Sequence, residues 1–403
     1  MTQPNWTEEE DNFDLTLSQR TEELYRIPNM EPKADGLIEA VGPVASTPIP
    51  EGCPVVDLGP LWLTPGFIDL HCHIAGVSFF MTNDLNDMVY MTNPGLRASS
   101  AVRPRNQDLS RAVAGGVTSV LYIPGSGTNI GGQGVLLKTW LPTYERMEIR
   151  NPGSLKLAQA GNPERWAMGV RRTLMNWNTR NTFQRGVAYG KRWEAFESGK
   201  GEKPEKDIQF EVFRDLVGKR TQVSTHTQIY QVVDMTISMI RKGFGLDVYI
   251  DHGTFDGWRA AAEAQEAGVP AILGPRGISR HYTDFIDTDG QIHGVAAKYQ
   301  EQGHKMIGFN TDAPVIPEEE LHVQAAVAVR YGLDNSGLEH LRGLTIVPAT
   351  AAGIQHLVGS LEPGKQADIL VTTGDPVDPR TSVEAVYIQG ELVYDAARDG
   401  RRW

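Results

Sequence analysis

Short apolar runs bounded by polar, glycine and proline residues alternate with amphipathic stretches over most of the chain. Eight of these runs have the length and composition of buried strands. Helical spacing of apolar residues occurs at 210–217, 258–267 and 318–331. This repeat of strand, loop and helix favours a parallel sheet with helices outside it. The expected strands are 66–71, 117–123, 135–138, 154–157, 222–226, 247–252, 270–273 and 305–310.

The repeat has the size of one closed α/β barrel. From the first expected strand through the helix after the eighth it covers roughly 250 residues, the usual length of a (β/α)8 TIM barrel. In that fold the carboxyl ends of the strands form one rim, and this rim carries the chemistry. Polar residues at the ends of the expected strands are therefore candidate site residues.

Further short apolar segments lie near both ends of the chain, at 36–42 and 54–58 and again at 367–373, 383–388 and 391–394. We expect them to pair into one small β-sandwich domain; the alternative is two unrelated β-edges on the barrel. The expected domains are a polar N-terminal extension at 1–35, the β-sandwich at 36–63 and 359–403, and the barrel at 64–358.

Composition and charge exclude several classes of function. The 403-residue chain is 40% hydrophobic and 22% charged, an ordinary globular balance. Its net charge of −12 disfavours nucleic-acid and anionic-membrane partners, because both need a basic surface. We therefore expect a small-molecule substrate, with neither nucleic acid nor membrane as a partner.

Cysteine usage and segment lengths bear on the compartment. The two cysteines, Cys53 and Cys72, predict no disulfide framework, and Cys72 is expected to be a buried, inert thiol. No segment has the apolar length of a membrane span or the form of a signal peptide, which favours a cytoplasmic location. The acidic residues 1–30 leave open a trimmed start of a longer, exported chain.

Two histidines two positions apart, His71 and His73, end the first expected strand. Residues at this spacing face the same side of a strand, so both imidazoles can point towards the barrel axis. Neutral imidazoles that converge on one point suit a borderline metal such as zinc. Two polar residues on an exposed strand face give the same pattern, so this pair alone is only moderately specific.

Three further residues raise the specificity of the pattern. His226 and His252 end the fifth and sixth expected strands, and Asp312 follows the eighth. Each alone is more often a structural histidine or a helix-capping aspartate. Together with the first pair they place five metal-ligand side chains at the carboxyl ends of four strands, which meet on one rim in a closed barrel. The sequence therefore predicts a divalent-metal site.

These motifs resemble those of the amidohydrolase superfamily. The similarity rests on residues 65–73, the histidines of the fifth and sixth strands, the aspartate after the eighth, and the segments 348–355 and 359–369. Stretches similar to 131–134 and 161–163 recur in the branch that holds imidazolonepropionase-like and prolidase-like enzymes. The resemblance implies a barrel hydrolase with one or two divalent metals, zinc above all.

In that family a lysine on the fourth strand can be carboxylated by CO2, and the carbamate then bridges two metals. Lys156 matches this place, and Lys138 on the third strand is the competing candidate. An unmodified lysine beside positive metals is electrostatically poor. The bland alternative is a strand-end lysine that reaches solvent.

The resemblance also implies a mechanism. One metal would be held by His71, His73 and Asp312 and a second by His226 and His252, with carboxylated Lys156 between them. A metal-activated hydroxide would attack the carbonyl carbon of an amide-type C–N bond, in a cyclic amide or a dipeptide. Asp312 is the expected catalytic residue, as general base and then acid.

Two alternatives remain open. The first is a mononuclear-metal deaminase of a ring amine, with ligands His71, His73, His226 and Asp312. Its weakness is that 226–229 lacks the nearby glutamate of many such deaminases. The second is a catalytically inactive scaffold, which would have no reason to keep all five ligand positions.

Loops around the expected rim bear on the substrate. The loop after the seventh strand carries Arg276, His281 and Tyr282, which are candidate substrate-binding residues. A solvated loop charge is the blander interpretation of Arg276. The segment 166–206 is expected to cover part of the site or to contact another copy, because related barrels are often homo-oligomers.

Overall fold

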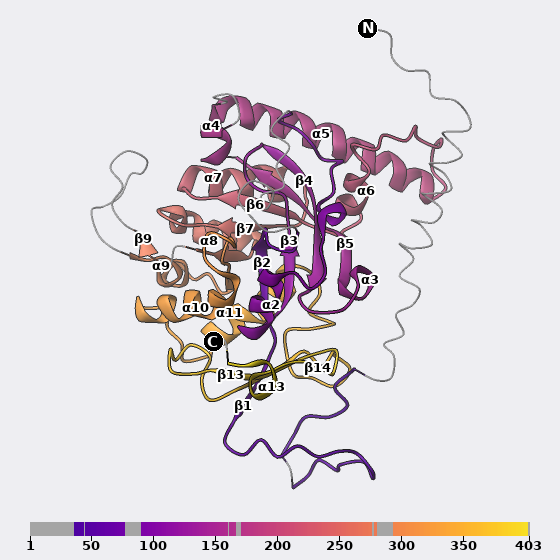
Figure 1. Ribbon diagram of the computed structural model, residues 1–403. Helices are drawn as coiled ribbons and strands as arrows, with labels where there is room; N and C mark the ends of the chain where they lie inside the picture. The colour runs from indigo at the N-terminus through magenta and orange to yellow at the C-terminus, as the bar shows by residue number, and fades with distance from the viewer. Residues whose placement is uncertain are drawn as a thin grey trace.

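The computed structural model describes residues 36–43, 45–76, 90–159, 161–166, 171–275, 278–279 and 293–401. These residues form an eight-stranded sheet surrounded by helices and, below it, a four-stranded antiparallel sheet (Figure 1). A short pair, β9 (Ile278–Ser279) and β10 (His293–Gly294), stands apart. The prediction of an α/β barrel with a small β-unit built from both ends of the chain is confirmed.

The large sheet has the order β2–β3–β4–β5–β6–β7–β8–β11, and each of its strands overlaps one of the eight expected segments. Most neighbours are parallel, but β4 is antiparallel to both β3 and β5, so the expectation of a wholly parallel sheet is wrong here. The reason is connection length: only residues 123–129 separate β3 from β4, too few for a crossover helix. The strands are β2 (Phe67–Cys72), β3 (Val117–Tyr122), β4 (Ile130–Lys138), β5 (Glu148–Ala158), β6 (Val223–Thr227), β7 (Val248–His252), β8 (Ala271–Leu273) and β11 (Ile307–Phe309).

The first and last strands of the sheet meet through a minimal contact. Cys72 of β2 forms an isolated parallel bridge with Ala313, just after β11. The His73 amide donates a hydrogen bond of 2.8 Å to the Ala313 carbonyl. Because this contact lies at the carboxyl ends of β2 and β11, the sheet closes beside the candidate site residues of both strands.

Glycines let β4 pack against its neighbours. At Gly132, φ is +121° and a Cβ would stand 2.7 Å from the Leu96 carbonyl oxygen. Only glycine adopts this conformation without strain, and only glycine leaves room for that carbonyl. Gly132 is therefore required by the close approach of β4 to the segment that carries Leu96.

The small sheet has the order β1–β12–β13–β14, with β1 (Trp62–Pro65), β12 (Ile369–Thr372), β13 (Val383–Ile388) and β14 (Glu391–Asp395). The three C-terminal strands were expected. The strands expected at 36–42 and 54–58 are wrong: the first contributes one bridge, Leu37 to Gln366, and the second contributes no strand. Val55 and Val56 are 67% and 69% exposed, so these apolar side chains do not pack against a sheet.

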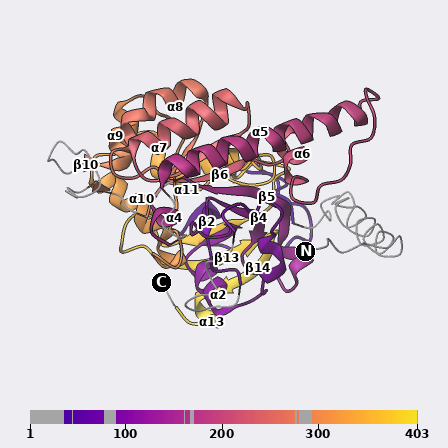
Figure 2. The ribbon, with the colours of Figure 1, turned by 90° about the horizontal axis from the view of Figure 1, so that it is seen from above.

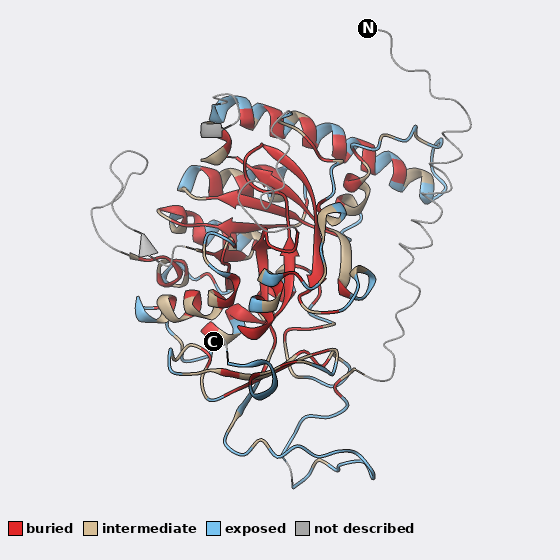
Figure 3. Ribbon diagram, in the orientation of Figure 1, coloured by how far each residue is buried: buried red, intermediate tan, exposed pale blue. Residues whose placement is uncertain are grey.

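Helices cover the outside of the barrel, and the strands are almost wholly buried beneath them (Figure 3). The longest, α5 (Arg172–Glu197), runs across the molecule in both views (Figures 1 and 2). The others are η1 (Ala98–Ala101), α2 (Gln107–Ala114), α3 (Tyr144–Met147), α4 (Asn162–Trp166), α6 (Val212–Val217), α7 (Tyr230–Met235), η2 (Thr236–Gly243), η3 (Gly257–Ala260), α8 (Ala261–Ala267), α9 (Val295–Glu301), η4 (Glu318–Glu320), α10 (Leu321–Arg330), α11 (Glu339–Leu344), α12 (Ile346–Ala351) and α13 (Ala396–Asp399).

Two apolar clusters form the core. The larger one lies between the strands and the surrounding helices. The smaller one joins side chains of β2, β3, β4, β7 and β8 to α12, and since these strands lie on different sides of the barrel it fills the interior. Arg150, near the start of β5, donates to the Ala352 carbonyl after α12. The interior is therefore filled with apolar side chains at the end opposite the carboxyl rim.

Among the described residues, no helix is long and apolar enough to cross a bilayer.

Candidate metal centre

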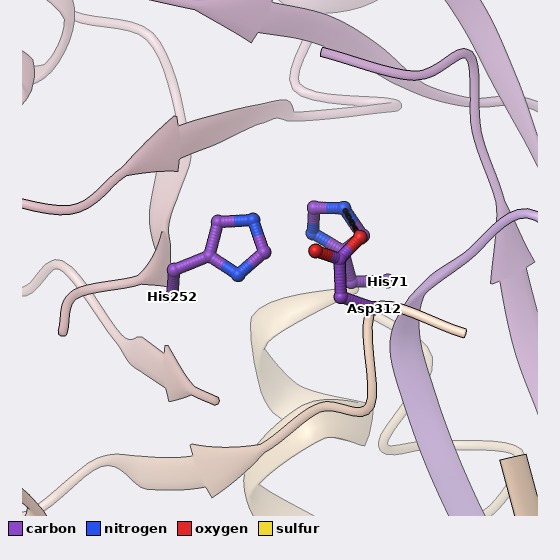
Figure 4. A group of neighbouring side chains, drawn as sticks. All are labelled: His71, His252 and Asp312. Carbon is purple, nitrogen blue, oxygen red and sulfur yellow. Dashed lines mark ion pairs between the residues drawn. The ribbon is translucent and has the colours of Figure 1, made fainter. Parts of the chain in front are cut away.

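The five side chains that the sequence marked as metal ligands meet at the carboxyl rim of the barrel. His71 lies on β2, His226 on β6 and His252 at the end of β7, while His73 and Asp312 follow β2 and β11. All four histidines are at least 95% buried. Figure 4 shows His71 and Asp312 side by side with the ring of His252 facing them.

The distances define the centre. Nε2 of His71 and Nε2 of His73 each lie 3.2 Å from Oδ1 of Asp312. One ligand atom from each of His71, His252 and Asp312 lies within 4.8 Å of the others, which makes these three a candidate metal site. The ring of His226 completes the group, with its centroid 4.4 Å from that of His252.

Each histidine is held through its other ring nitrogen. Nδ1 of His71 lies 2.9 Å from Asp251 Oδ2. Nδ1 of His226 lies 2.9 Å from Ser126 Oγ. The Nδ1 atoms of His73 and His252 lie 2.9 and 2.8 Å from the carbonyl oxygens of Ile123 and Gly274. A carbonyl only accepts, so in these last two rings Nδ1 carries the proton and Nε2 keeps its lone pair.

Backbone conformation aims two of the ligands. His252 has φ +72° and Asp312 has φ +52°, both in the left-handed region that residues with a Cβ rarely adopt. Such conformations persist where the surrounding structure imposes them, and they concentrate at functional sites. Here they turn both side chains into the centre at points where each strand has just ended.

Burial and mutual charge set the protonation states. Burial, with the charges of His252 and Lys156, lowers the pKa of His226 well below its ordinary value. Burial, with the charge of His71, lowers the pKa of His252 to about 4. Burial opposes ionisation of Asp312, but the charge and hydrogen bond of His71 outweigh it and hold the Asp312 pKa well below its ordinary value. At neutral pH His226 and His252 are therefore neutral imidazoles, and Asp312 is an ionised carboxylate.

His71 differs from the other rings. Burial alone would lower its pKa, but the negative charge of Asp251 outweighs burial and the pKa rises to about 9. Part of this rise comes from Asp312 on the other side of the ring. A metal cation bound at Nε2 of His71 would replace the proton on that nitrogen. Its positive charge would then be balanced by the same two carboxylates, Asp251 and Asp312.

The two candidate lysines lie at opposite ends of the barrel. Lys156 on β5 is fully buried, and its Nζ lies 3.2 Å from Nε2 of His71. Lys138 ends β4, whose direction is reversed, so it lies at the far end with its Nζ 2.6 Å from Asp368 Oδ2. Lys138 is therefore an ion-pair partner of the small-sheet segment, and its candidacy for the bridging position is wrong.

Supporting residues that sequence reasoning did not single out lie directly behind the ligands. Asp69 accepts hydrogen bonds of 2.8, 2.8 and 2.7 Å from the amides of His71 and Thr311 and from the Thr311 hydroxyl. It thus joins β2 to the turn that carries Asp312. Burial raises the pKa of Asp69 to about 7 and the pKa of the neighbouring Glu318 well above its ordinary value.

A sequence signal existed for some of these residues. Asp69 stands two positions before His71 on an otherwise apolar strand, and Asp251 directly precedes His252 on another. A carboxylate inside an apolar run is costly unless it is paired, so each could have been marked as a partner of a site residue. Ser126 lies in a loop with no such contrast and gave no signal.

Several predicted site residues cannot be placed. Arg276, His281 and Tyr282 lie outside the described residues. Of the segment 166–206, most is helix α5, which is tied to the rim through a buried amide network. Asn178 of α5 donates 2.7 Å to Asn129 Oδ1, and Asn129 in turn donates 2.8 Å to the Ala158 carbonyl at the end of β5.

The donor set fits a divalent ion. Nε2 of His226 and Nε2 of His252 are buried and have no hydrogen-bond partner among the described residues. The lone pair of His73 Nε2 faces the Asp312 carboxylate at 3.2 Å, an arrangement of two acceptors that a cation between them would relieve. Imidazole nitrogens with one carboxylate are the ligands of a borderline divalent metal such as zinc.

Comparisons with known proteins agree with this geometry. The model of the amidohydrolase family matches residues 256–393. The solved amidohydrolase of Thermotoga maritima MSB8 is 31% identical, with a TM-score of 0.79 over 90% of this chain and 94% of that one. The amidohydrolase tasK of Hapsidospora irregularis is 26% identical over 89% of this chain. The chain spans only 39% of the length of that curated relative.

A prolidase solved with N-methylphosphonate-L-proline shares the fold, at 15% identity and a TM-score of 0.52 over 90% of this chain and 93% of that one. Fold and site together define a protein of the α/β-barrel class with a histidine- and aspartate-rich centre at its carboxyl rim. The chain belongs to the amidohydrolase family, as the sequence motifs predicted.

Proposed function

We propose that this protein is a metal-dependent hydrolase that cleaves an amide-type C–N bond in a cyclic amide or a dipeptide. The observation that carries the proposal is the preorganised ligand set. Four buried histidines are fixed through Nδ1 and gather around one ionised aspartate. Membership of the amidohydrolase family supports the bond type.

The residues divide the chemistry among them. When bound, a divalent metal would polarise the substrate carbonyl and lower the pKa of a water molecule towards about 7. Asp312 is ionised at neutral pH and would accept the proton of the attacking water, then deliver it to the leaving nitrogen. His71 and His73 would hold the metal beside that carboxylate, since both Nε2 atoms lie 3.2 Å from its Oδ1.

Lys156 is proposed to carry a carbamate and to support a second ion at His226 and His252. Its Nζ is buried 3.2 Å from His71, where an ammonium group beside metal ions would be repelled. The ammonium group would first lose a proton, and the neutral amine would then bond to the carbon of CO2 and lose a second proton, so that a cation becomes an anion. That change of charge makes a two-ion centre electrostatically favourable.

The test is elemental analysis of protein purified without chelator and without a metal-affinity step. About two divalent ions per chain, falling to about one in Lys156→Ala, would support the two-ion centre. About one ion in the wild-type protein would favour a mononuclear deaminase of ring amines. No bound ion after zinc is supplied would contradict the proposal and favour a scaffold.

Activity should follow the metal. We expect a chelator to abolish hydrolysis of dipeptides or cyclic amides and zinc or manganese to restore it. The reason is that the metal ion is the Lewis acid on which the proposed reaction depends. The assay compares turnover before chelation, after it and after reloading. Turnover that persists in metal-free protein would show that the reaction does not use this centre.

A further inference from the structure

One carboxylate of the barrel interior faces a site histidine and little else. Asp251 on β7 is fully buried, and its Oδ2 lies 2.9 Å from Nδ1 of His71, across the interior on β2. Within the described part of the chain, neither carboxylate oxygen of Asp251 has a hydrogen-bond partner, and its one ion pair is the contact of Oδ2 with this ring. A buried charge with a single partner is costly, so the pairing needs an explanation.

Among the described residues, the other three site histidines have no carboxylate at Nδ1. His73 and His252 face backbone carbonyls, and His226 faces the hydroxyl of Ser126. These neutral groups fix ring orientation but add no net charge. A carboxylate behind an imidazole also makes its metal-binding nitrogen more basic.

The consequence is an uneven distribution of charge over the centre. His71 lies between two carboxylates, Asp251 at Nδ1 and Asp312 at Nε2. Among the described residues, the half formed by His226 and His252 has no carboxylate at either Nδ1 atom, since these atoms face the Ser126 hydroxyl and the Gly274 carbonyl. A divalent cation is therefore attracted far more strongly to the first half than to the second.

We propose that Asp251 is a positioning residue that makes the half of the centre formed by His71, His73 and Asp312 the first and tighter metal site. This inference rests on the proposed metal-dependent function. Asp251 keeps the proton of His71 on Nδ1, directs the Nε2 lone pair to the ion and supplies the balancing negative charge. Binding at His226 and His252 then follows as a separate, weaker step.

The test measures the two binding steps separately. Metal-free wild-type protein and Asp251→Asn are titrated with Zn²⁺ against a competing chelator, and with Co²⁺ followed by its visible absorption. Asn keeps the shape but removes the charge, so we expect the first step to weaken by about 10–100-fold and the second to change little. A purely structural role for Asp251 would weaken both steps or neither.

Ser126→Ala is the matched control, because it removes the Nδ1 partner of a histidine in the other half. It should weaken the second step and leave the first unchanged. Asp251→Glu, which keeps the charge one methylene further out, should bind the first ion with intermediate affinity and serves if Asp251→Asn does not fold.

A first step as tight in Asp251→Asn as in wild type would overturn the role of Asp251 and leave the proposed function intact. Wild-type protein that binds no Zn²⁺ or Co²⁺ would overturn both.

Discussion

At the scale of single residues, the centre depends on a few side chains whose orientation the backbone imposes. His252 and Asp312 adopt left-handed conformations at strand ends, and Asp312 is fixed from behind by the hydrogen bonds of Thr311 to Asp69. The strain in these two residues is maintained by the strands around them. Substitution at such a position should therefore affect chemistry more than folding.

Asp312→Asn tests the proton-transfer role. Asparagine fills the same space but cannot take up a proton, so hydrolysis should fall by about 10²–10⁴-fold while the thermal unfolding midpoint changes little. Turnover and thermal unfolding are measured on the same preparation. Asp375→Asn, which alters an aspartate paired with His340 in another part of the chain, is the control and should keep full activity. Unchanged turnover in Asp312→Asn would refute the assigned role.

At the scale of elements, the short helix η4 supports the turn between β11 and the ligand Asp312. Glu318 of η4 is 2% exposed, and its Oε2 lies 3.4 Å from the Thr311 hydroxyl oxygen. Its other oxygen is buried and has no hydrogen-bond partner in the part of the chain that the structure describes. With Asp69 alongside, this places two buried carboxyl groups together behind the site, and burial raises the pKa of Glu318 well above 4.5.

The Glu318 pKa predicts a pH dependence of stability. The folded state keeps a proton that the unfolded state releases, so the free energy of unfolding falls as pH rises above about 4.5 towards the folded pKa. Glu318→Gln imitates the protonated acid and should remove this part of the fall. Urea unfolding at about pH 5 and about pH 8 should show near-equal stability at the lower pH and a more stable variant at the higher one.

Glu320→Gln, on the same short helix but only half-buried, is the control and should retain the wild-type pH dependence. Parallel stability curves for wild type and Glu318→Gln would contradict the prediction.

At the scale of the whole molecule, a buried ion pair joins the barrel to the small sheet. Lys138 at the end of β4 and Asp368 just before β12 are 1% and 4% exposed, with 2.6 Å between Nζ and Oδ2. Asp368 also accepts a hydrogen bond from the Gln389 amide between β13 and β14. The pair therefore fixes where the small sheet attaches to the closed end of the barrel, far from the metal centre.

Lys138→Met should destabilise the fold without touching the site. It leaves the Asp368 carboxylate buried and unpaired, which costs about 3–5 kcal/mol in the free energy of unfolding. Urea unfolding gives this value, and elemental analysis should give an unchanged metal content. Lys298→Met, which breaks a pair with Glu301 on the surface of α9, should cost about 0–1 kcal/mol. Loss of metal in Lys138→Met would contradict the placement of this lysine.

The sequence by itself determined the strands of the barrel, the three C-terminal strands of the small sheet and the family. The spacing and type of apolar residues identify a buried strand from its own segment of sequence. The ligand residues could be recognised because each stands at or just after the end of such a strand. The residue types also predicted which side chains gather at the rim, because a closed barrel brings all carboxyl ends together.

Only the tertiary structure decided the different positions of Lys138 and Lys156 and the pairing of Asp251 with His71. Each depends on contacts between residues far apart in the chain: 85 positions for Lys156 and His71, and 230 for Lys138 and Asp368. The pattern of residues within one segment does not show which distant segment will lie beside it in the fold. The energy of a buried charge is set by the group that faces it across the fold.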